Sequence, residues 1–209
     1  MNSSGAGQEE GAAGREPRRR RDPERTRAVL LDALLELIAE GAGEPTRKAI
    51  AERAGVSERS VFVHFADREA LYVGAAERQA QRWQAFADPI PSRWDTPRKV
   101  EALLAQRSRM YELMTPIRRV GLALEPDSPG LRLVMGRGDA WFRDDLTANF
   151  PELEREPGAL RPGGLLDALE AASSWAAWDH LRTRRGLTEE AARSALRRTL
   201  GALLGCPRD

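Results

Sequence analysis

Cysteine, lysine and histidine are scarce in this sequence, and long apolar runs are absent. Cys206 is the only cysteine, so the chain has no partner for an intrachain disulfide, which suits a reducing compartment. No stretch approaches the ~20 apolar residues that cross a bilayer, and the amino terminus has no apolar segment typical of a secretory signal. We therefore expect a cytoplasmic protein with no membrane contact.

Motifs of enzymes and metal sites are absent as well. There is no glycine-rich phosphate loop, no nucleophile elbow and no histidine pair with the spacing of metal ligands. His64 and His180 are the only histidines. The sequence therefore predicts neither an enzyme nor a metalloprotein, and it indicates no cofactor.

Charge is balanced overall but not along the chain. Lys+Arg 33 against Asp+Glu 32 leaves a net charge of +1, which does not by itself indicate nucleic-acid binding. Residues 1–21 have no periodic apolar pattern and read as a disordered tail that ends in Arg18, Arg19, Arg20 and Arg21. These arginines would enter a minor groove or neutralise phosphates of DNA. The alternative is a solvated basic tail that aids solubility. Codon usage in a GC-rich genome favours arginine and would explain part of this arginine content.

Residues 46–71 have the spacing of a helix-turn-helix. Thr46 is placed to cap a first short helix, and Gly55 supplies the positive φ of a sharp turn. Ser57 is placed to cap a second helix, on which Val61 would pack inward. The second helix of such a motif lies in the major groove of DNA.

The string IAERAGVSERSVFVHFADREAL, which starts at Ile50, resembles the amino-terminal domain of the tetracycline-repressor (TetR) family of transcriptional regulators. Three positions depart from the family pattern: Ser60 replaces the usual threonine, Phe62 the usual tyrosine, and Arg68 the usual lysine. Phe62 lacks a hydroxyl that commonly reaches a backbone phosphate in relatives. The resemblance implies an all-α fold with an amino-terminal three-helix helix-turn-helix domain and a larger helical domain for ligand binding and dimerisation.

The second helix of the motif carries the candidate contacts to bases. Arg59 would pair with O6 and N7 of guanine. Phosphate contacts set the register and carry no sequence information. Phe62 is a further candidate for DNA contact, although part of its side chain is expected to join the core. The candidates for base edges are Ser57, Glu58, Arg59 and Val63, and those for phosphates are Thr46, Lys48, Ser60, His64 and Arg68.

Apolar periodicity and turn residues predict the remaining helices. Asp22 starts a helix to about Glu40, and Asp67 caps a helix that runs toward Phe86. Three prolines between Asp88 and Pro97 mark a break. The predicted segments are a tail over 1–21, a helix-turn-helix domain with its connecting helix over 22–87, and a ligand-binding and dimerisation domain over 88–209.

Within 88–209 the pattern predicts two terminal amphipathic helices. They resemble the family's dimerisation pair, which forms a four-helix bundle with its symmetry mate; the alternative is that they only close the core of the monomer. The predicted elements are a helix from Thr96 that Pro116 interrupts, a short helix to Leu124, a loop over 125–130, a helix over 131–150, an exposed connection over 151–164, and terminal helices over 165–184 and from Thr188 to Leu204.

Aromatic and methionine side chains occur on several predicted helices. They would line a cavity for an apolar or aromatic ligand, or else fill an ordinary core, and spacing does not separate the two. The candidate ligand-binding residues are Trp83, Met110, Tyr111, Met114, Trp141, Phe142, Trp175 and Trp178. The charged residues Arg107, Arg118, Arg119, Asp139 and Asp179 are possible polar anchors, but we expect solvated helix faces for them.

These features predict a homodimeric transcriptional regulator, a repressor that a small molecule releases from its double-stranded DNA operator. Release would follow if the ligand binds better to one of two conformers. The competing hypothesis is a helical ligand-binding or partner-binding protein that keeps the helix-turn-helix scaffold without operator binding. Phe62 and the near-neutral charge motivate that alternative.

Overall fold

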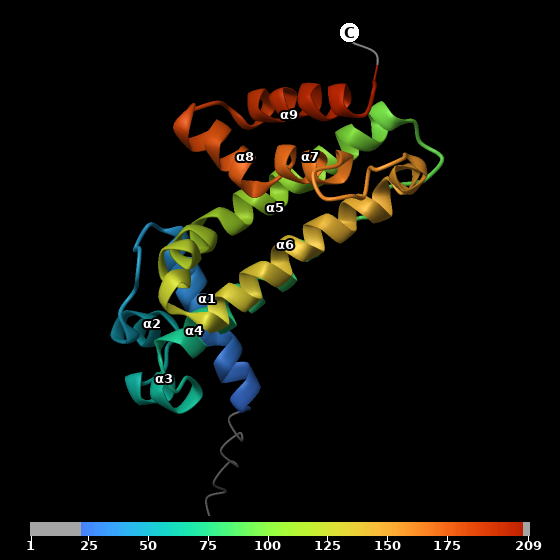
Figure 1. Ribbon diagram of the computed structural model, residues 1–209. Coiled ribbons are helices and arrows are strands. Elements are labelled where there is room, and N and C mark those ends of the chain that lie inside the picture. Colours follow the sequence, from blue (N-terminus) through green and yellow to red (C-terminus); the bar gives the residue numbers. More distant parts are fainter. Residues whose placement is uncertain (1–21, 207–209) are drawn as a thin grey trace, which may run out of the picture.

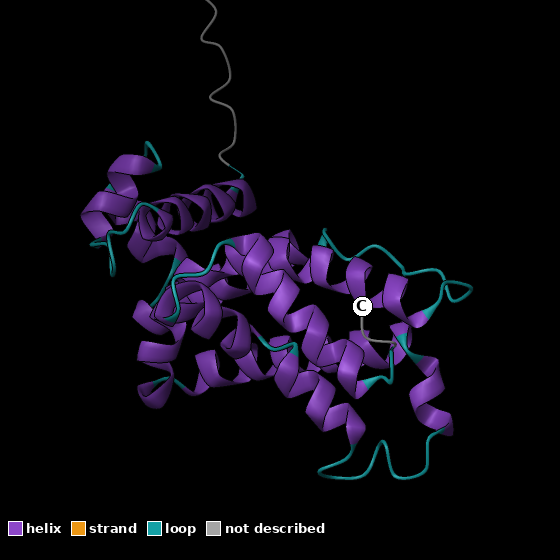
Figure 2. Cartoon of the chain, turned by 90° about the horizontal axis from the view of Figure 1, so that it is seen from above, coloured by secondary structure: helices purple, strands orange, loops and turns teal. Residues whose placement is uncertain are grey.

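The computed structural model describes residues 22–206, and every regular element in that range is helical (Figures 1 and 2). Helices α1–α3 lie at one end of the molecule and α7–α9 at the other, with α4, α5 and α6 running between them (Figure 1). None of the described helices is long and apolar enough to span a membrane. The helices are α1 (Pro23–Ala39), α2 (Arg47–Arg53), α3 (Glu58–His64), α4 (Arg68–Gln84), α5 (Thr96–Leu124), α6 (Pro129–Asn149), α7 (Leu165–Ala172), α8 (Trp175–Asp179) and α9 (Glu189–Leu203).

Short polar side chains cap seven of these helices, among them the four starts that the sequence assigned to a capping residue and that are described next. Asp22, Thr46, Asp67 and Thr188 each accept a hydrogen bond from a backbone N–H two or three residues further on, at 3.0, 3.1, 2.7 and 3.2 Å. Each bond satisfies one of the N–H groups that a helix start leaves without a partner. The predicted starts of α1, α2, α4 and α9 are therefore confirmed.

The amino-terminal core joins the helix-turn-helix to the rest of the chain. Leu30 and Leu34 on α1 are fully buried against α2, α3 and α4, and Ile117 and Leu131 reach the same cluster from α5 and α6. On the edge of this core, hydrogen bonding from Arg78 on α4 lowers the pKa of Asp32 on α1. Because α4 packs on helices from both sides of residue 87, the proposed division at that position stays a prediction.

Pro116 does not interrupt its helix, so the predicted break and the separate short helix to Leu124 are wrong. Helix α5 passes through this proline to Leu124. A proline inside a helix removes one backbone hydrogen bond, and packing on either side compensates for the loss. Met114 and Ile117, which flank Pro116, are both buried. The tertiary contacts therefore keep α5 continuous.

The predicted helix over 165–184 is instead divided at Ser173. Helix α7 ends at Ala172, and Ser174 then caps the short α8, which runs into a π-helical turn, His180–Arg184. The carbonyl of Ser173 accepts hydrogen bonds from Arg107 and Tyr111 of α5 rather than continuing a helical ladder. The buried side chains of Arg107 and Tyr111 therefore take the place of a helical N–H as donors to the Ser173 carbonyl.

Two segments predicted as loops are more ordered than expected. The 125–130 segment forms a 3₁₀ turn, Glu125–Asp127, and α6 then begins at Pro129. In the segment 151–164, a second 3₁₀ turn, Pro151–Arg155, places Leu153 in the core, and Ala159 is also buried. The prediction that this whole connection is exposed is therefore wrong.

Candidate nucleic-acid interface and the adjoining pocket

The turn between α2 and α3 gives α3 one buried and one exposed face. Gly55 has φ +65°, and the N–H of Val56 closes the turn on the carbonyl of Ala51 at 3.0 Å. Val61 and Phe65 are buried in one cluster with residues of α1, α2 and α4, whereas Phe62 and Val63 between them are exposed. A seven-residue helix is therefore held with its outer side available to a partner.

The outer side of α3 brings together three of the four candidates for base edges, with Phe62. Glu58, Arg59, Phe62 and Val63 line a shallow depression of about 560 Å³. Val63 is 72% exposed and Phe62 51% exposed, so the expectation that Phe62 joins the core is wrong. Ser57 holds the N-cap position, but its hydroxyl bonds that of Ser60 at 2.9 Å and not the helix backbone.

The candidates for phosphate contacts differ in how their side chains are engaged. The Thr46 hydroxyl caps α2, and the Arg68 guanidinium is paired with Glu44. Lys48 is exposed and lies 3.9 Å from the Glu52 carboxylate. His64 is half-buried at the end of α3. Of these, Lys48 is the most openly placed cation.

Two arginines that the sequence did not single out support α3. Arg27 on α1 donates to the carbonyl of His64 at 3.1 Å and covers the ring of Phe65 at 4.4 Å. Arg47, the first residue of α2, places its guanidinium 4.3 Å from the ring of Phe62. These contacts join residues distant in sequence, so no local pattern would have revealed them.

The family described as bacterial regulatory proteins, tetR family, matches residues 30–75, which include most of α1 through the middle of α4. The amino-terminal domain is a TetR-family helix-turn-helix domain. The predicted recognition of this family and the predicted all-α fold are thus confirmed. A comparison with curated proteins finds no match.

Solved structures extend the TetR likeness in fold to most of the chain. A TetR-family transcriptional regulator from Streptomyces coelicolor is 17% identical, with 87% of this chain and 81% of that chain covered and a TM-score of 0.68. A transcriptional regulator from Rhodococcus sp. Rha1 is 22% identical, with 88% and 96% covered and a TM-score of 0.64. The multidrug binding protein EbrR, complexed with imidazole, is 24% identical, with 91% and 94% covered and a TM-score of 0.56. The chain therefore has the fold of a TetR-family transcriptional regulator.

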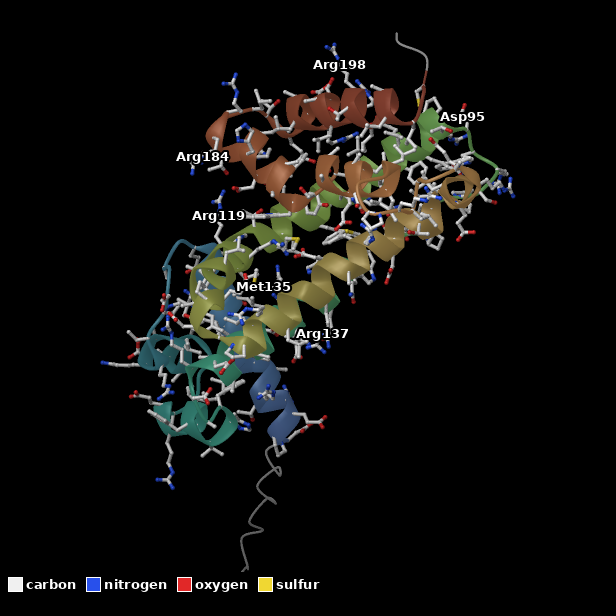
Figure 3. All side chains as sticks on the ribbon, viewed as in Figure 1. Asp95, Arg119, Met135, Arg137, Arg184 and Arg198 are labelled. Atoms are coloured by element: carbon white, nitrogen blue, oxygen red, sulfur yellow. The ribbon has the colours of Figure 1, made fainter. Side chains whose placement is uncertain are left out.

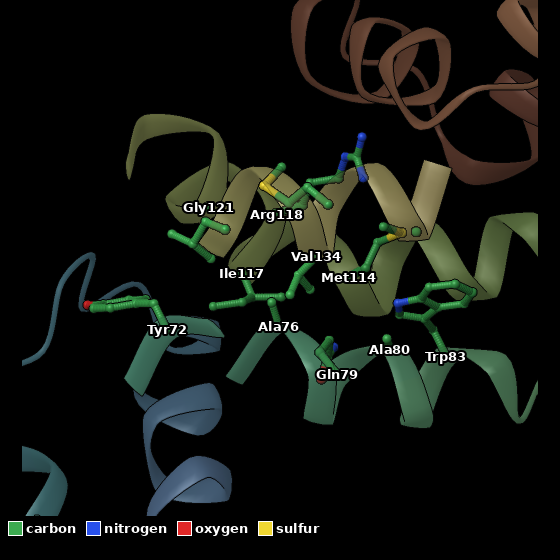
Figure 4. Close-up of a pocket in the computed structure, with 13 residues that line it drawn as sticks. Tyr72, Ala76, Gln79, Ala80, Trp83, Met114, Ile117, Arg118, Gly121 and Val134 are labelled. Atoms are coloured by element: carbon green, nitrogen blue, oxygen red, sulfur yellow. The ribbon is translucent and has the colours of Figure 1, made fainter. Parts of the chain in front are cut away.

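Beyond the TetR-family domain, a narrow pocket lies between α4, α5 and α6 (Figure 4). Its volume is about 50 Å³, more than the roughly 10–15 Å³ that one water requires. Trp83 and Met114 are the two predicted ligand-binding residues that line it. The remaining lining residues are Tyr72, Ala76, Gln79, Ala80, Ile117, Arg118, Gly121, Leu131, Val134, Met135 and Gly138.

The other six candidate ligand-binding residues belong to the carboxyl-terminal core or lie against it. The ring of Trp83 stacks on Phe142 at a centroid distance of 4.9 Å, and Trp141, half-buried, meets Trp83 edge-on at 4.9 Å. This aromatic group forms the boundary between the pocket and the core. The candidates packed in the core itself are Met110, Tyr111, Phe142, Trp175 and Trp178.

Two polar side chains of the pocket keep an atom without a hydrogen-bond partner within residues 22–206. Gln79, 5% exposed, donates from Nε2 to the carbonyl of Leu113 at 2.6 Å, while its Oε1 has no partner. Arg118 pairs through Nη2 with Asp139 at 2.7 Å, while its buried Nε has none. Most buried polar groups are satisfied, so these two atoms are exceptions among the residues that line the pocket.

Two of the charged residues expected on solvated faces are buried or mostly covered. Arg107 is 2% exposed and the Arg118 side chain 13% exposed, so the expectation is wrong for both. Arg119, labelled in Figure 3, is exposed but pairs with Asp179 at 2.6 Å. The sequence alone does not distinguish these arginines, because the helices that pack against α5 decide which of its faces are covered.

Helix α4 links the pocket to the TetR-family domain. Glu69, in its first turn, accepts hydrogen bonds from the Ser128 hydroxyl at 2.8 Å and from the N–H of Gly130 at 2.7 Å, so it caps α6. The same helix carries Gln79 and Trp83 into the pocket. Within the described residues, no cluster of His, Cys, Asp or Glu is placed to hold a metal ion.

Proposed function

We propose that the protein is a DNA-binding transcriptional regulator, a repressor that a small apolar or aromatic molecule releases from its operator. The observation that carries the proposal is the outer side of α3, where Arg59, Phe62 and Val63 are exposed together. In a helix-turn-helix this face enters the major groove. Arginine suits guanine there, and apolar side chains suit the thymine methyl group.

The proposed regulator acts as a homodimer through its two carboxyl-terminal helical segments, α7–α8 and α9. Their leucines, including Leu169, Leu196 and Leu200, close the core of the monomer. Some of their exposed positions carry small side chains, which allow helices of two protomers to approach closely. These exposed alanines are Ala171, Ala176, Ala191 and Ala202. Two copies would present two copies of α3 to two half-sites.

The proposed effector binds in the pocket between α4, α5 and α6. A ligand that binds one conformer better shifts the population toward it. A change in the spacing of α4 and α6 would strain the contacts of Glu69, whose carboxylate joins the start of α4 to the start of α6. EbrR, which has a similar fold, is named for multidrug binding and is complexed with imidazole, a small ring compound.

Selection of sequences from random double-stranded DNA, followed by gel-shift titration at a stated salt concentration, tests the function. We expect an inverted repeat that binds at least ~10³-fold more tightly than random DNA. If no sequence binds better than random DNA, the protein is instead a helical binding protein that keeps the scaffold without operator recognition.

Removal of a thymine methyl group should reveal the contact made by Val63. Replacement of each half-site thymine by deoxyuridine is expected to weaken binding about fourfold at one position, because one buried methyl contributes ~0.8 kcal/mol. In Val63→Ala the same DNA change should have little further effect. Deoxyuridine outside the half-sites serves as the control, and an equal loss in both proteins would contradict the contact.

The amino-terminal arginines lie outside the described residues, and their DNA contact stays a prediction. Deletion of residues 1–21 should weaken operator binding and reduce the slope of log K against log salt by about one for each arginine that neutralises a phosphate. Deletion of residues 1–14, which keeps Arg18 to Arg21, is the control. An unchanged slope after the longer deletion would exclude the contact.

A further inference from the structure

Arg47 carries a charge that no carboxylate balances within residues 22–206. It is the first residue of α2, which packs on α3 (Figure 1). Arg53, at the other end of α2, pairs with Glu40 at 2.7 Å. Among the described residues Arg47 has no ion pair and no side-chain hydrogen bond, and its guanidinium instead meets the ring of Phe62 on α3. Its charge is therefore available to a partner of opposite sign.

The ring of Phe62 holds the Arg47 guanidinium in place without using its hydrogen bonds. The guanidinium carbon lies 4.3 Å from the centre of the ring, well within the ~6 Å over which a cation is attracted to an aromatic face. Phenylalanine has no oxygen or nitrogen in its side chain to accept a hydrogen bond. The N–H donors of Arg47, whose planar fork matches a phosphate group, therefore still lack an oxygen acceptor.

The contact with Phe62 also places Arg47 at the edge of the outer face of α3. Phe62 lines the shallow depression on that face, whereas Arg47 touches Phe62 but is not part of the lining. A helix in the major groove has a phosphate backbone on each side, and the first helix of the motif crosses one of them. The edge of this face, on the side of α2, therefore corresponds to a phosphate and not to base edges.

The lining of the depression brings no net positive charge to such a phosphate. Glu58 and Arg59 carry opposite charges, and Phe62 and Val63 carry none. Phe62 has no hydroxyl that could donate to a phosphate oxygen itself. A cation from outside the lining is therefore needed, and Arg47 is the one that contacts it.

We infer that Arg47 binds a backbone phosphate of the operator at the edge of α3, and that Phe62 is a positioning residue that holds the guanidinium there. The inference rests on the proposed function, since it assigns roles to two residues in operator binding. Together the two side chains fix how α3 sits in the groove, because a phosphate contact sets the register of a DNA-binding helix.

Replacement of Arg47 by alanine tests the contact. Gel-shift titration of the full-length protein should show operator binding weakened about tenfold, as for loss of a charge-assisted hydrogen bond. The slope of log K against log salt should fall by about one per protomer. An unchanged affinity and slope, with folding verified by circular dichroism, would overturn the inference.

Neutral methylphosphonates, placed one at a time in the operator, locate the phosphate. One position beside each half-site should weaken wild-type binding about threefold, since each protomer supplies half of the tenfold effect in free energy. The same replacement should have little further effect on Arg47→Ala. Lys48→Ala is the matched control, because it removes the neighbouring cation but keeps Arg47, and the threefold loss should persist in it. Equal losses in wild type and Arg47→Ala at every position would reject the contact.

Substitution of Phe62 separates positioning from a direct contact with DNA. Phe62→Leu should weaken binding about two- to fivefold in the wild-type background, because an exposed cation–π contact contributes ~0.5–1 kcal/mol. It should have little effect in Arg47→Ala, since the ring acts through the guanidinium. Phe62→Tyr keeps the ring and should retain at least the wild-type affinity. If Phe62→Leu causes the same loss in both backgrounds, Phe62 acts on DNA by itself and the positioning role is rejected.

Random DNA separates this inference from the proposed function. A phosphate contact acts on every sequence, so Arg47→Ala should also weaken binding to random duplexes. That loss, without any preferred sequence, would support the contact and reject operator recognition. A selected operator that wild type and Arg47→Ala bind equally would leave the regulator standing and reject the role of Arg47.

Discussion

Replacement of Arg107 by methionine is expected to lower the free energy of unfolding by about 3–5 kcal/mol. The Arg107 guanidinium is 2% exposed and donates to Ser173 Oγ at 2.5 Å, to the carbonyl of Phe142 at 2.8 Å and to the Asp145 carboxylate at 3.3 Å. Methionine would fill part of the space but leave these acceptors, one of them charged, without a donor. Urea denaturation followed by circular dichroism measures the loss.

A neighbouring arginine provides the control for this prediction. Arg109 lies on the same helix but is exposed, and its Nε donates to the helix carbonyl of Ala105. Arg109→Met should change the unfolding free energy by less than ~0.5 kcal/mol. Similar losses in both variants would show that the Arg107 network does not hold α5 to α7.

The Arg107 network also explains the division between α7 and α8. Burial raises the pKa of Tyr111, so its phenol stays protonated and donates to the carbonyl of Ser173 at 2.6 Å. Arg107 Nη1 donates to the same carbonyl at 3.2 Å. Without Arg107, the Ser173 carbonyl would lose one of its two side-chain donors, so we expect the break between α7 and α8 to be less strongly stabilised.

Substitution of Arg59 by alanine is expected to cause the largest loss of operator affinity. A bidentate contact between arginine and guanine contributes about 1–3 kcal/mol of discrimination, and a homodimer would lose it in both half-sites, for a total of about 2–6 kcal/mol. The selectivity for guanine at the contacted position should also relax. Gel-shift titration of the selected operator and of its single-base variants measures both effects.

Lys48 provides the contrasting control for Arg59. Lys48 is an exposed cation, and we expect it to contact phosphate and so to contribute to the binding of every sequence. Lys48→Ala should weaken operator and random DNA alike and reduce the salt slope by about 1 per protomer. If Arg59→Ala behaves in the same way, Arg59 contacts phosphate and another residue of α3 reads the base.

Local chemistry explains which parts of the fold the sequence predicted well. The caps Asp22, Thr46 and Asp67 act on backbone groups within three residues, and Gly55 adopts its positive φ within a single turn. Such interactions depend on neighbours in the chain. The helix-turn-helix and its family could therefore be recognised before its packing was known.

The predictions that were wrong have a different cause. The structure at each of those positions depends on contacts between residues far apart in sequence. Packing against other helices keeps α5 continuous through Pro116, whereas donors from α5 divide the predicted helix at Ser173. Phe62 is exposed beside Arg47, although its apolar side chain suggested the core. The intrinsic preference of a residue for helix, loop or core is weak, and tertiary contacts often override it.

The sequence by itself determined the helix-turn-helix, its outward residues Arg59 and Val63, and the all-α class, since these follow from turn geometry and helical periodicity. Only the tertiary structure decided which aromatic side chains line the pocket and which fill the core. It also decided that Gln79 and Arg118 share that pocket with an unpartnered atom each. The physical reason is that hydrogen-bond satisfaction and burial depend on the arrangement of α4, α5 and α6 in space, which no single helix encodes.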